Sequence, residues 1–357
     1  ILAGLGGIVI FVPQIAFLFA FIAFLEDTGY MARVSFITDK LLRGVGLNGR
    51  SIIPLLSGAG CAIPAIMSAR TISSWKERLI TIMVTPLMSC SARLPVYTLI
   101  IGLIIPAEEF MGFNLQGLVL MAFYLTGFVA AISIAFLMKF IINSSERSYY
   151  IMEMPSYKIP DWKTVMYTIV EKVKVFLFDA GKIIIAISIV LWVLSSFAPG
   201  NKFEKIEEKW LGKVDSEIHI AAEKLEASYA GMIGKTIEPA IKPLGFDWKI
   251  GISLITSFAA REVFVGTMST IYSVGDENIQ SIQERMKNVK NKETGEAFFT
   301  PAVGISLMLF YAFAMQCMGT VAIVYRETGH WKWPAIQFLY MGALAYLSSF
   351  IAYQLLS

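Results

Sequence analysis

The stretch Pro54-Leu-Leu-Ser-Gly-Ala-Gly-Cys-Ala-Ile-Pro64 decides how this chain is expected to fold. It lies inside an apolar run, 51–69, and places two prolines and two glycines within eleven residues. Proline removes a backbone donor and clashes with the preceding helical turn, so a continuous helix tolerates such a sequence poorly. The run therefore predicts a re-entrant hairpin, which returns to the side of the apolar layer from which it entered.

Composition indicates that this layer is a lipid bilayer. Of the 357 residues, 56% are hydrophobic and only 16% are charged, whereas soluble domains contain about 25% charged residues. The mean hydropathy of +0.64 indicates a membrane protein, and the eight apolar runs given below exclude a soluble enzyme and a singly anchored protein. The net charge is only +3 and the basic residues are dispersed over loops, so a nucleic-acid partner is not indicated. Apolar runs of roughly the length needed for one crossing, about 20 residues, occur at 5–25, 51–69, 79–105, 115–142, 180–198, 249–273, 301–325 and 334–356.

The second half of the chain repeats the first. An offset of 199 residues pairs Tyr30 with Tyr229 and Gly46 with Gly245, and beyond a polar insertion an offset of 227 pairs Cys90 with Cys317. If 51–69 and 249–273 are both hairpins, each half has three full crossings, and this odd number inverts the second half relative to the first. Inverted repeats of this kind are typical of transporters.

The predicted fold is therefore an all-α polytopic membrane protein with two inverted-topology repeats, each of three spans plus one re-entrant hairpin. Eight full spans are the alternative. The expected organisation is a first repeat at 1–142, a cytoplasmic connection at 143–179, and a second repeat at 180–357 that holds the polar segments 199–248 and 274–300.

Loop charges favour the hairpin interpretation. Loop 106–114 has no Lys or Arg and carries Glu108 and Glu109, so it is expected outside by the positive-inside rule. Counting from there, a re-entrant 51–69 leaves both of the basic loops 26–50 and 70–78 in the cytoplasm. A full crossing at 51–69 would place the first of them outside.

Three cysteines lie in apolar segments that are interrupted by Pro, Gly or polar residues: Cys61, Cys90 and Cys317. An odd number outside the loops does not fit a secreted disulfide framework. Thiolate and thioether ligands select ions such as Fe(II), Cu(I) and Zn(II) over Mg(II) and Ca(II). The three thiols are candidate metal ligands, with Met88 and Met315 as candidate soft ligands. The alternative is that these side chains are ordinary buried packing.

Charged residues in or beside apolar segments are the other candidates, because such residues are expensive in a bilayer. Glu262 is a candidate oxygen ligand, and its alternative role is a structural ion pair with Arg261 or Arg93. Glu26 and Asp27 close the first apolar run, as Glu327 closes the seventh. These acids are expected either to form an ion exit or to cap helix ends and pair with arginines. Arg93 and Arg261 complete the set of exit or gating candidates. The sequence has no catalytic motif and no phosphate-binding loop.

Several strings together resemble the membrane domain of the ferrous iron transport protein B (FeoB) family. They are Leu25-Glu-Asp-Thr-Gly-Tyr-Met-Ala-Arg33, Pro54-Leu-Leu-Ser-Gly-Ala-Gly-Cys-Ala-Ile-Pro-Ala65, Ser89-Cys-Ser-Ala-Arg-Leu-Pro-Val-Tyr97, Phe258-Ala-Ala-Arg-Glu-Val-Phe264 and Arg326-Glu-Thr-Gly329.

This resemblance implies a bacterial inner-membrane Fe(II) importer with paired Gate regions, in which the three cysteines match the family's membrane cysteines. It also implies an amino-terminal GTPase domain in cis that binds GTP and Mg, and a small cytoplasmic FeoA-like partner. The oligomeric state is open from the sequence, and a homo-oligomer is one alternative. The chain begins at Ile1 inside an apolar run, which suggests a fragment of a longer protein, so the GTPase is expected to lie outside this sequence. Around Cys317 the chain has Met-Gln-Cys, where many relatives have Pro before the Cys.

Other functions remain open from the sequence. The nearest are transport of another divalent metal or of an organic solute such as a nucleoside, which would favour Asn, Gln and aromatic residues around the hairpins. A membrane scaffold without a transport path is a further alternative. An intramembrane enzyme fits least, because no paired carboxylates or His motif lies at membrane depth.

Overall fold

The computed structural model is mostly helical and divides into two compact units. The first comprises Ile1–Ser91, Tyr124–Ile185 and Gly319–Leu339, and the second comprises Ala92–Phe123, Ala186–Met318 and Tyr340–Ser357. The structure describes residues 13, 16–17, 19–106, 108–110, 112–142, 157–175, 177–178, 181–199, 203, 206, 216–258, 261, 263–272, 279–287, 289 and 298–357.

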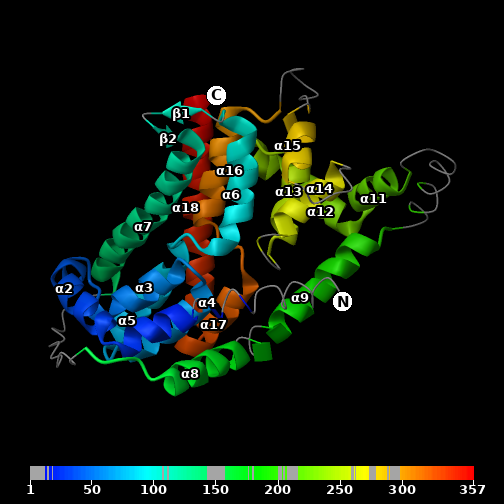
Figure 1. Ribbon diagram of the computed structural model, residues 1–357. Coiled ribbons are helices and arrows are strands. Elements are labelled where there is room, and N and C mark those ends of the chain that lie inside the picture. The colour runs from blue at the N-terminus through cyan, green and yellow to red at the C-terminus, as the bar shows by residue number, and fades with distance from the viewer. Residues whose placement is uncertain are drawn as a thin grey trace. The chain divides into compact units, whose positions relative to one another are not determined.

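The first unit contains the N-terminal helices that Figure 1 shows in blue, and one green helix from the middle of the chain. Those that lie wholly within it are α2 (Tyr30–Gly44), α3 (Ile52–Gly58), α4 (Ala62–Ser68), α5 (Trp75–Val84) and α8 (Trp162–Val175). The long helices α7 (Leu115–Ile141) and α18 (Lys332–Leu356) each have residues in both units, as do α9 (Gly181–Ser196) and α17 (Met318–Thr328).

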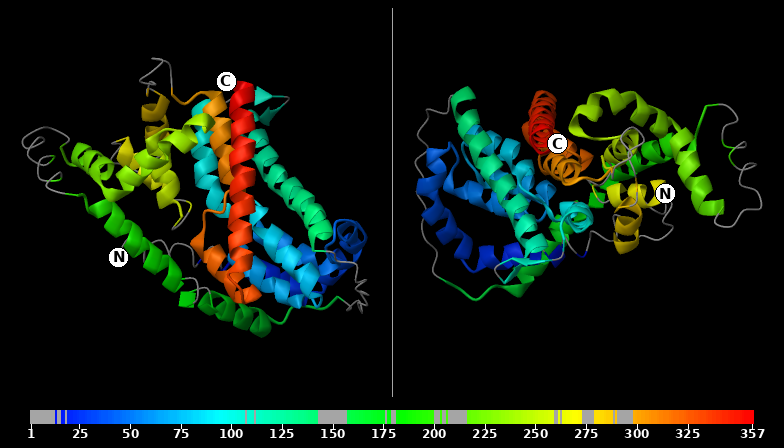
Figure 2. Two further views of the ribbon diagram at one scale, coloured as in Figure 1. Left: turned by 180° about the vertical axis from the view of Figure 1, so that it is seen from behind. Right: turned by 90° about the horizontal axis from the view of Figure 1, so that it is seen from above.

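The second unit is built mainly from the second half of the chain. Its helices are α6 (Leu94–Ile104), α11 (Ser216–Ala227), α12 (Tyr229–Ile241), α13 (Trp248–Thr256), α14 (Val263–Ile271), α15 (Ile279–Lys287) and α16 (Pro301–Phe313). A minimal antiparallel pair, β1 (Glu109–Phe110) and β2 (Phe113–Asn114), closes the loop between α6 and α7, with Glu109 opposite Asn114. Helices α6 and α16 run side by side in both views of Figure 2.

The segment 51–69 is broken where its sequence predicts. Helices α3 and α4 have seven residues each, which corresponds to about 10 Å of helix and is far short of a bilayer crossing. The two helices pack against each other and are joined by a turn at Ala59–Cys61, in which the amides of Gly60 and Cys61 both donate to the Ser57 carbonyl. The segment is thus a helical hairpin.

Positions that the offset of 199 pairs have similar local geometry. Helix α2 begins at Tyr30 and α12 begins at Tyr229, as the offset of 199 requires. Gly46 and Gly245 both have left-handed backbones, with φ of 83° and 82°, a conformation that favours glycine. The next helical segment is capped in the first repeat by Asn48 and in the second by Asp247, and each side chain accepts a backbone N–H. Matching turns and caps therefore occur at matching positions.

Four described segments are long and apolar enough to cross a membrane: Trp75–Ile104, Leu115–Ile141, Pro301–Thr328 and Lys332–Leu356. They match the predicted runs 79–105, 115–142, 301–325 and 334–356. Most of the first predicted span, 5–25, lies outside the described residues, and α9 in the run 180–198 has 16 residues. The chain is therefore a multi-pass α-helical membrane protein.

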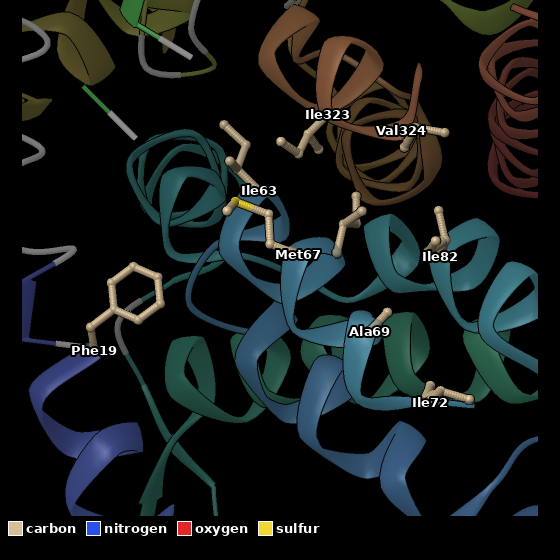
Figure 3. Close-up of a cluster of buried hydrophobic side chains, with 9 residues drawn as sticks. Phe19, Ile63, Met67, Ala69, Ile72, Ile82, Ile323 and Val324 are labelled. Atoms are coloured by element: carbon tan, nitrogen blue, oxygen red, sulfur yellow. The ribbon is translucent and has the colours of Figure 1, made fainter. Parts of the chain in front are cut away.

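The core of the first unit joins the hairpin to α17. Ile63, Ile66 and Met67 of α4 pack with Ile323 and Val324 of α17, and Figure 3 shows these two helices facing each other across the cluster. Cys61, at the start of α4, is partly buried against the same cluster. Helix α4 is thus held in place over its whole length by apolar contacts.

Candidate functional site

Two of the four candidate spans are interrupted near their middle, and each interruption holds a cysteine. The span Trp75–Ile104 loses its α-helical geometry between α5 and α6, around Cys90, and the span Pro301–Thr328 loses it between α16 and α17, at Ala314–Cys317. In the apolar 18-residue stretch of each interrupted span, 56% and 67% is buried inside the protein. The corresponding shares are 17% and 22% for the two continuous spans. The interrupted spans therefore face protein, and the continuous ones have apolar surface left for lipid.

In the first unit, the Cys90 interruption rests on the turn of the α3–α4 hairpin. Both the backbone N–H and the hydroxyl of Ser91 donate to the Gly60 carbonyl, at 3.3 and 3.0 Å. Because Ser91 follows Cys90 and Gly60 precedes Cys61, these bonds bring the two cysteine-bearing segments into direct contact. Both cysteines are half-buried thiols.

Close packing supports this contact. A Cβ atom added to Gly58, at the end of α3, would lie only 3.2 Å from the Thr85 methyl group and 3.3 Å from Cβ of Met88. Met88, a predicted soft ligand, is itself buried. The hairpin and the interruption are therefore packed so closely that a methyl group at position 58 would require its neighbours to shift by a few tenths of an ångström.

The second half repeats this arrangement. The backbone N–H of Met318 donates to the Phe258 carbonyl at 3.3 Å, so the residue that follows Cys317 binds the segment between α13 and α14. Met318 and Ser91 are related by the offset of 227. Cys317 is a half-buried thiol and Met315 is buried. Cys90 and Cys317, which the sequence offset pairs, therefore each lie next to a residue that binds the broken segment of its own half.

Arg261 fixes the second interruption. Its guanidinium is buried and donates to the Tyr311 carbonyl at 3.4 Å and to the Ala314 carbonyl at 3.1 Å, and the Tyr311 hydroxyl donates back to the Arg261 carbonyl. The first carbonyl belongs to the last turn of α16 and the second to its C-cap residue, and a cation is also favoured at this end by the helix dipole. The sequence indicated Arg261 as a gating or ion-pair residue but did not reveal these backbone acceptors.

The remaining predicted ligands are less well defined. Glu262 lies outside the described residues, and Arg93 is completely buried at the start of α6. Among the residues that the structure describes, no three His, Cys, Asp or Glu side chains come together as a metal site. The first unit thus provides two thiols beside one turn, and the second provides one.

At the end of the first apolar run, Asp27 faces a cavity of about 270 Å³ that Glu26, Lys158 and Thr164 also line. The backbone N–H of Asp161 donates to Asp27 at 2.7 Å, and the Lys158 ammonium lies 3.2 Å from the carboxylate. The Asp161 amide first and Lys158 second lower the pKa of Asp27 below its usual value. Asp27 therefore joins the first helix to the segment that precedes α8.

Glu327 makes a buried charge cluster. Its carboxylate accepts from Arg70 at 2.9 and 3.0 Å and from Arg78 at 2.9 Å, and its side chain is only 2% exposed. The sequence places Glu327 at a helix end but does not reveal these two partners. They lie 257 and 249 residues away along the chain, beyond any local signal.

Comparison with known proteins adds two family models. The Gate family, described as nucleoside recognition, matches residues 8–104 and 177–331. The family of the ferrous iron transport protein B C terminus matches residues 120–172. The two Gate matches cover both interrupted spans and both broken segments described above.

Similar proteins include the Fe(2+) transporter FeoB of Leptospira biflexa, which is 46% identical over 99% of this chain and 50% of its own length. The Fe(2+) transport protein A/Fe(2+) transporter FeoB fusion protein of Porphyromonas gingivalis is 39% identical over 99% of this chain and 43% of its own length. The Fe(2+) transporter FeoB of Staphylococcus aureus is 36% identical over 99% and 48%. The chain spans about half the length of these curated relatives. No solved structure matches it.

Proposed function

The chain belongs to the Gate family in the form found in Fe(2+) transporters FeoB, and from this premise we propose that it forms the path by which Fe(II) crosses the bacterial inner membrane. The observation that carries the proposal is the pair of interrupted, buried spans, each of which places a thiol beside a broken segment. An amino-terminal domain that binds GTP and Mg would gate this path. A FeoA-like protein is a proposed partner, because one relative is a fusion with Fe(2+) transport protein A.

The proposed topology is two inverted repeats of three spans, each with one re-entrant hairpin. Matching helix starts, left-handed glycines and caps support the repeat. The seven-residue helices α3 and α4 support re-entry, because neither is long enough to cross. An odd number of spans in each half then inverts the second half, as in many secondary transporters.

The proposed ion site combines Cys61 and Cys90 with Cys317, and adds Glu262, Met88 and Met315 as further ligands. Ser91 and Gly60 hold the first two cysteine segments together. Interrupted spans leave backbone carbonyls without helical partners, and such irregular backbone is tolerated at membrane depth where it lines a cavity. Thiolates favour Fe(II), Zn(II) and Cu(I) over hard ions. Affinity alone would favour Zn(II) over Fe(II), so other ligands must contribute to the selectivity for iron.

The proposed exit lies near Glu26 and Asp27. The cavity there is open to both carboxylates, and Lys158 already occupies one side of Asp27 as a tethered cation. Arg93 and Arg261 are proposed to hold the interruptions in place, because both are buried at helix ends beside the cysteine segments.

Nucleoside transport is the second candidate, since the Gate family model carries that description. A nucleoside site needs hydrogen-bonding and aromatic side chains around the ligand. The described turn at Ala59–Cys61 has small residues and a thiol instead. The donor set therefore favours a metal ion.

The test is anaerobic Fe(II) uptake by the full-length transporter in liposomes. Replacing Cys90 and Cys317 together with serine is expected to lower uptake at least about tenfold, since loss of even outer-shell partners costs 10-fold to 100-fold in metal affinity. Met341→Leu is the matched control, because it removes a sulfur from a buried position on α18 that is outside the proposed site. Undiminished uptake by a correctly inserted double variant would reject the proposed site. Uptake of a nucleoside in place of Fe(II) would support the second candidate.

A further inference from the structure

Gln316, which precedes Cys317, carries a buried polar atom whose role the fold does not explain. The residue is 1% exposed, and its side-chain oxygen has no hydrogen-bond partner among the described residues. A buried unpaired acceptor costs about 1–3 kcal/mol. Such groups are rare in native proteins, and where they occur a bound ion or an ordered water often satisfies them.

Three backbone groups around Gln316 in this interruption, by contrast, have partners within the protein. The Ala314 carbonyl accepts from Arg261 and from the Gln316 backbone N–H, and the Met318 N–H donates to Phe258. The backbone around Gln316 is thus held by protein contacts. The Gln316 amide oxygen is left as an unsatisfied acceptor, in the residue that directly precedes Cys317.

The first half has a related pair. The offset of 227 places Gln316 on Ser89, which is also 1% exposed and directly precedes Cys90. Each half therefore joins one half-buried thiol to one buried oxygen-bearing side chain. Oxygen ligands favour harder ions than thiolates do, so a mixed set moves preference from Zn(II) and Cu(I) toward Fe(II) and Mn(II).

We propose that the Gln316 amide oxygen is a ligand of the transported ion beside Cys317 and sets selectivity for Fe(II) over Zn(II). This inference rests on the proposed Fe(II) path and adds a residue to it. Amide oxygen is a neutral ligand, so it contributes without adding charge to a buried site.

The test measures metal binding to the purified full-length transporter, without nucleotide and under anaerobic conditions, by competition with a colorimetric chelator. Gln316→Leu is expected to weaken Fe(II) and Mn(II) binding at least about tenfold and to leave Zn(II) binding within about twofold. Gln316→Glu restores an oxygen and is expected to recover Fe(II) binding. Gln337→Leu is the matched control, because Gln337 also has a buried oxygen without a hydrogen-bond partner among the described residues, yet lies on the continuous helix α18.

Thermal stability of the metal-free protein separates a ligand from a structural residue. Replacing an unpaired buried oxygen with an apolar group is neutral or stabilising, so Gln316→Leu should not lower the melting temperature. A clear decrease would indicate a structural role and would overturn the proposal. Equal loss of Fe(II) and Zn(II) binding, or no loss of either, would also overturn it.

A comparison with Cys317→Ser distinguishes this proposal from the Fe(II) path. If Cys317→Ser weakens Fe(II) binding and Gln316→Leu does not, the Fe(II) path stands and only the role of Gln316 is rejected. If Cys317→Ser leaves Fe(II) binding unchanged, both the proposed Fe(II) path at Cys317 and the role of Gln316 are rejected.

Discussion

At the scale of single residues, Arg261 shows how a buried charge shapes the candidate site. Its two hydrogen bonds to the last carbonyls of α16 are charge-assisted, and such bonds contribute about 1.5–3 kcal/mol each. Arg261→Met keeps the length of the side chain and removes both bonds, so it should lower the stability of the transporter by about 2–4 kcal/mol. Arg261→Lys keeps the charge but loses the planar guanidinium. Its stability should therefore lie between those of the wild type and Arg261→Met.

The measurement is the thermal unfolding midpoint in detergent, with Arg43→Met as the control. Arg43 is 48% exposed and pairs with Asp39 four residues away, and exposed pairs of this kind contribute less than about 1 kcal/mol. Equal effects of the two Met variants would show that the buried carbonyl contacts do not stabilise the interruption.

The sequence alone marks Arg261 as a candidate, but its acceptors are backbone atoms 50 and 53 residues away. Only the fold reveals them.

At the scale of elements, α17 packs on the hairpin of the first repeat within the first unit. It starts beside Cys317, packs through Ile323 and Val324 on α4, and ends with Glu327 between Arg70 and Arg78. Breaking a fully buried ion pair costs about 3–5 kcal/mol. Arg70 is 49% exposed, so water will solvate it once its partner is lost, and Glu327→Gln should cost less, about 2 kcal/mol.

Chemical unfolding followed by tryptophan fluorescence checks this value. The control is Glu226→Gln, which breaks a pair that is 43% and 47% exposed and should cost less than about 1 kcal/mol. If Glu327→Gln costs no more than this control, the cluster does not hold α17 on the hairpin.

The helices and their interruptions also show which features the sequence can predict and why it does not predict the long-range contacts. Pro54, Pro64 and the glycines between them act on the local backbone, so the break at Ala59–Cys61 was readable from sequence, as was the interruption at Cys90. The repeat was readable because Tyr30 and Gly46 recur at a fixed offset. The partners of Glu327 depend on segments about 250 residues apart. No periodicity or motif predicts such contacts.

At the scale of the whole molecule, the proposed inverted repeats make a prediction about the sides of the membrane. A re-entrant 51–69 leaves Lys40 and Ser73, both exposed, on the same side, whereas a full crossing separates them. The same reasoning applies in the second repeat to Lys242 and Lys287, which flank 249–273. Inversion places this second pair on the side opposite the first. The positive-inside rule assigns the first pair to the cytoplasm, and counting three crossings from there (79–105, 115–142 and 180–198) places the second pair outside.

Single cysteines at these four positions, in a full-length transporter whose three native cysteines are serine, allow the test. A membrane-impermeant maleimide added to intact, outer-membrane-permeabilised cells is expected to label Lys242→Cys and Lys287→Cys, and to label Lys40→Cys and Ser73→Cys only after lysis. Because charge decides orientation only statistically, agreement within each pair is the stricter criterion. Opposite labelling within a pair would mean that the intervening segment crosses the membrane, and would replace the hairpin model with eight full spans. Labelling of all four positions from one side would keep both hairpins and reject the inversion.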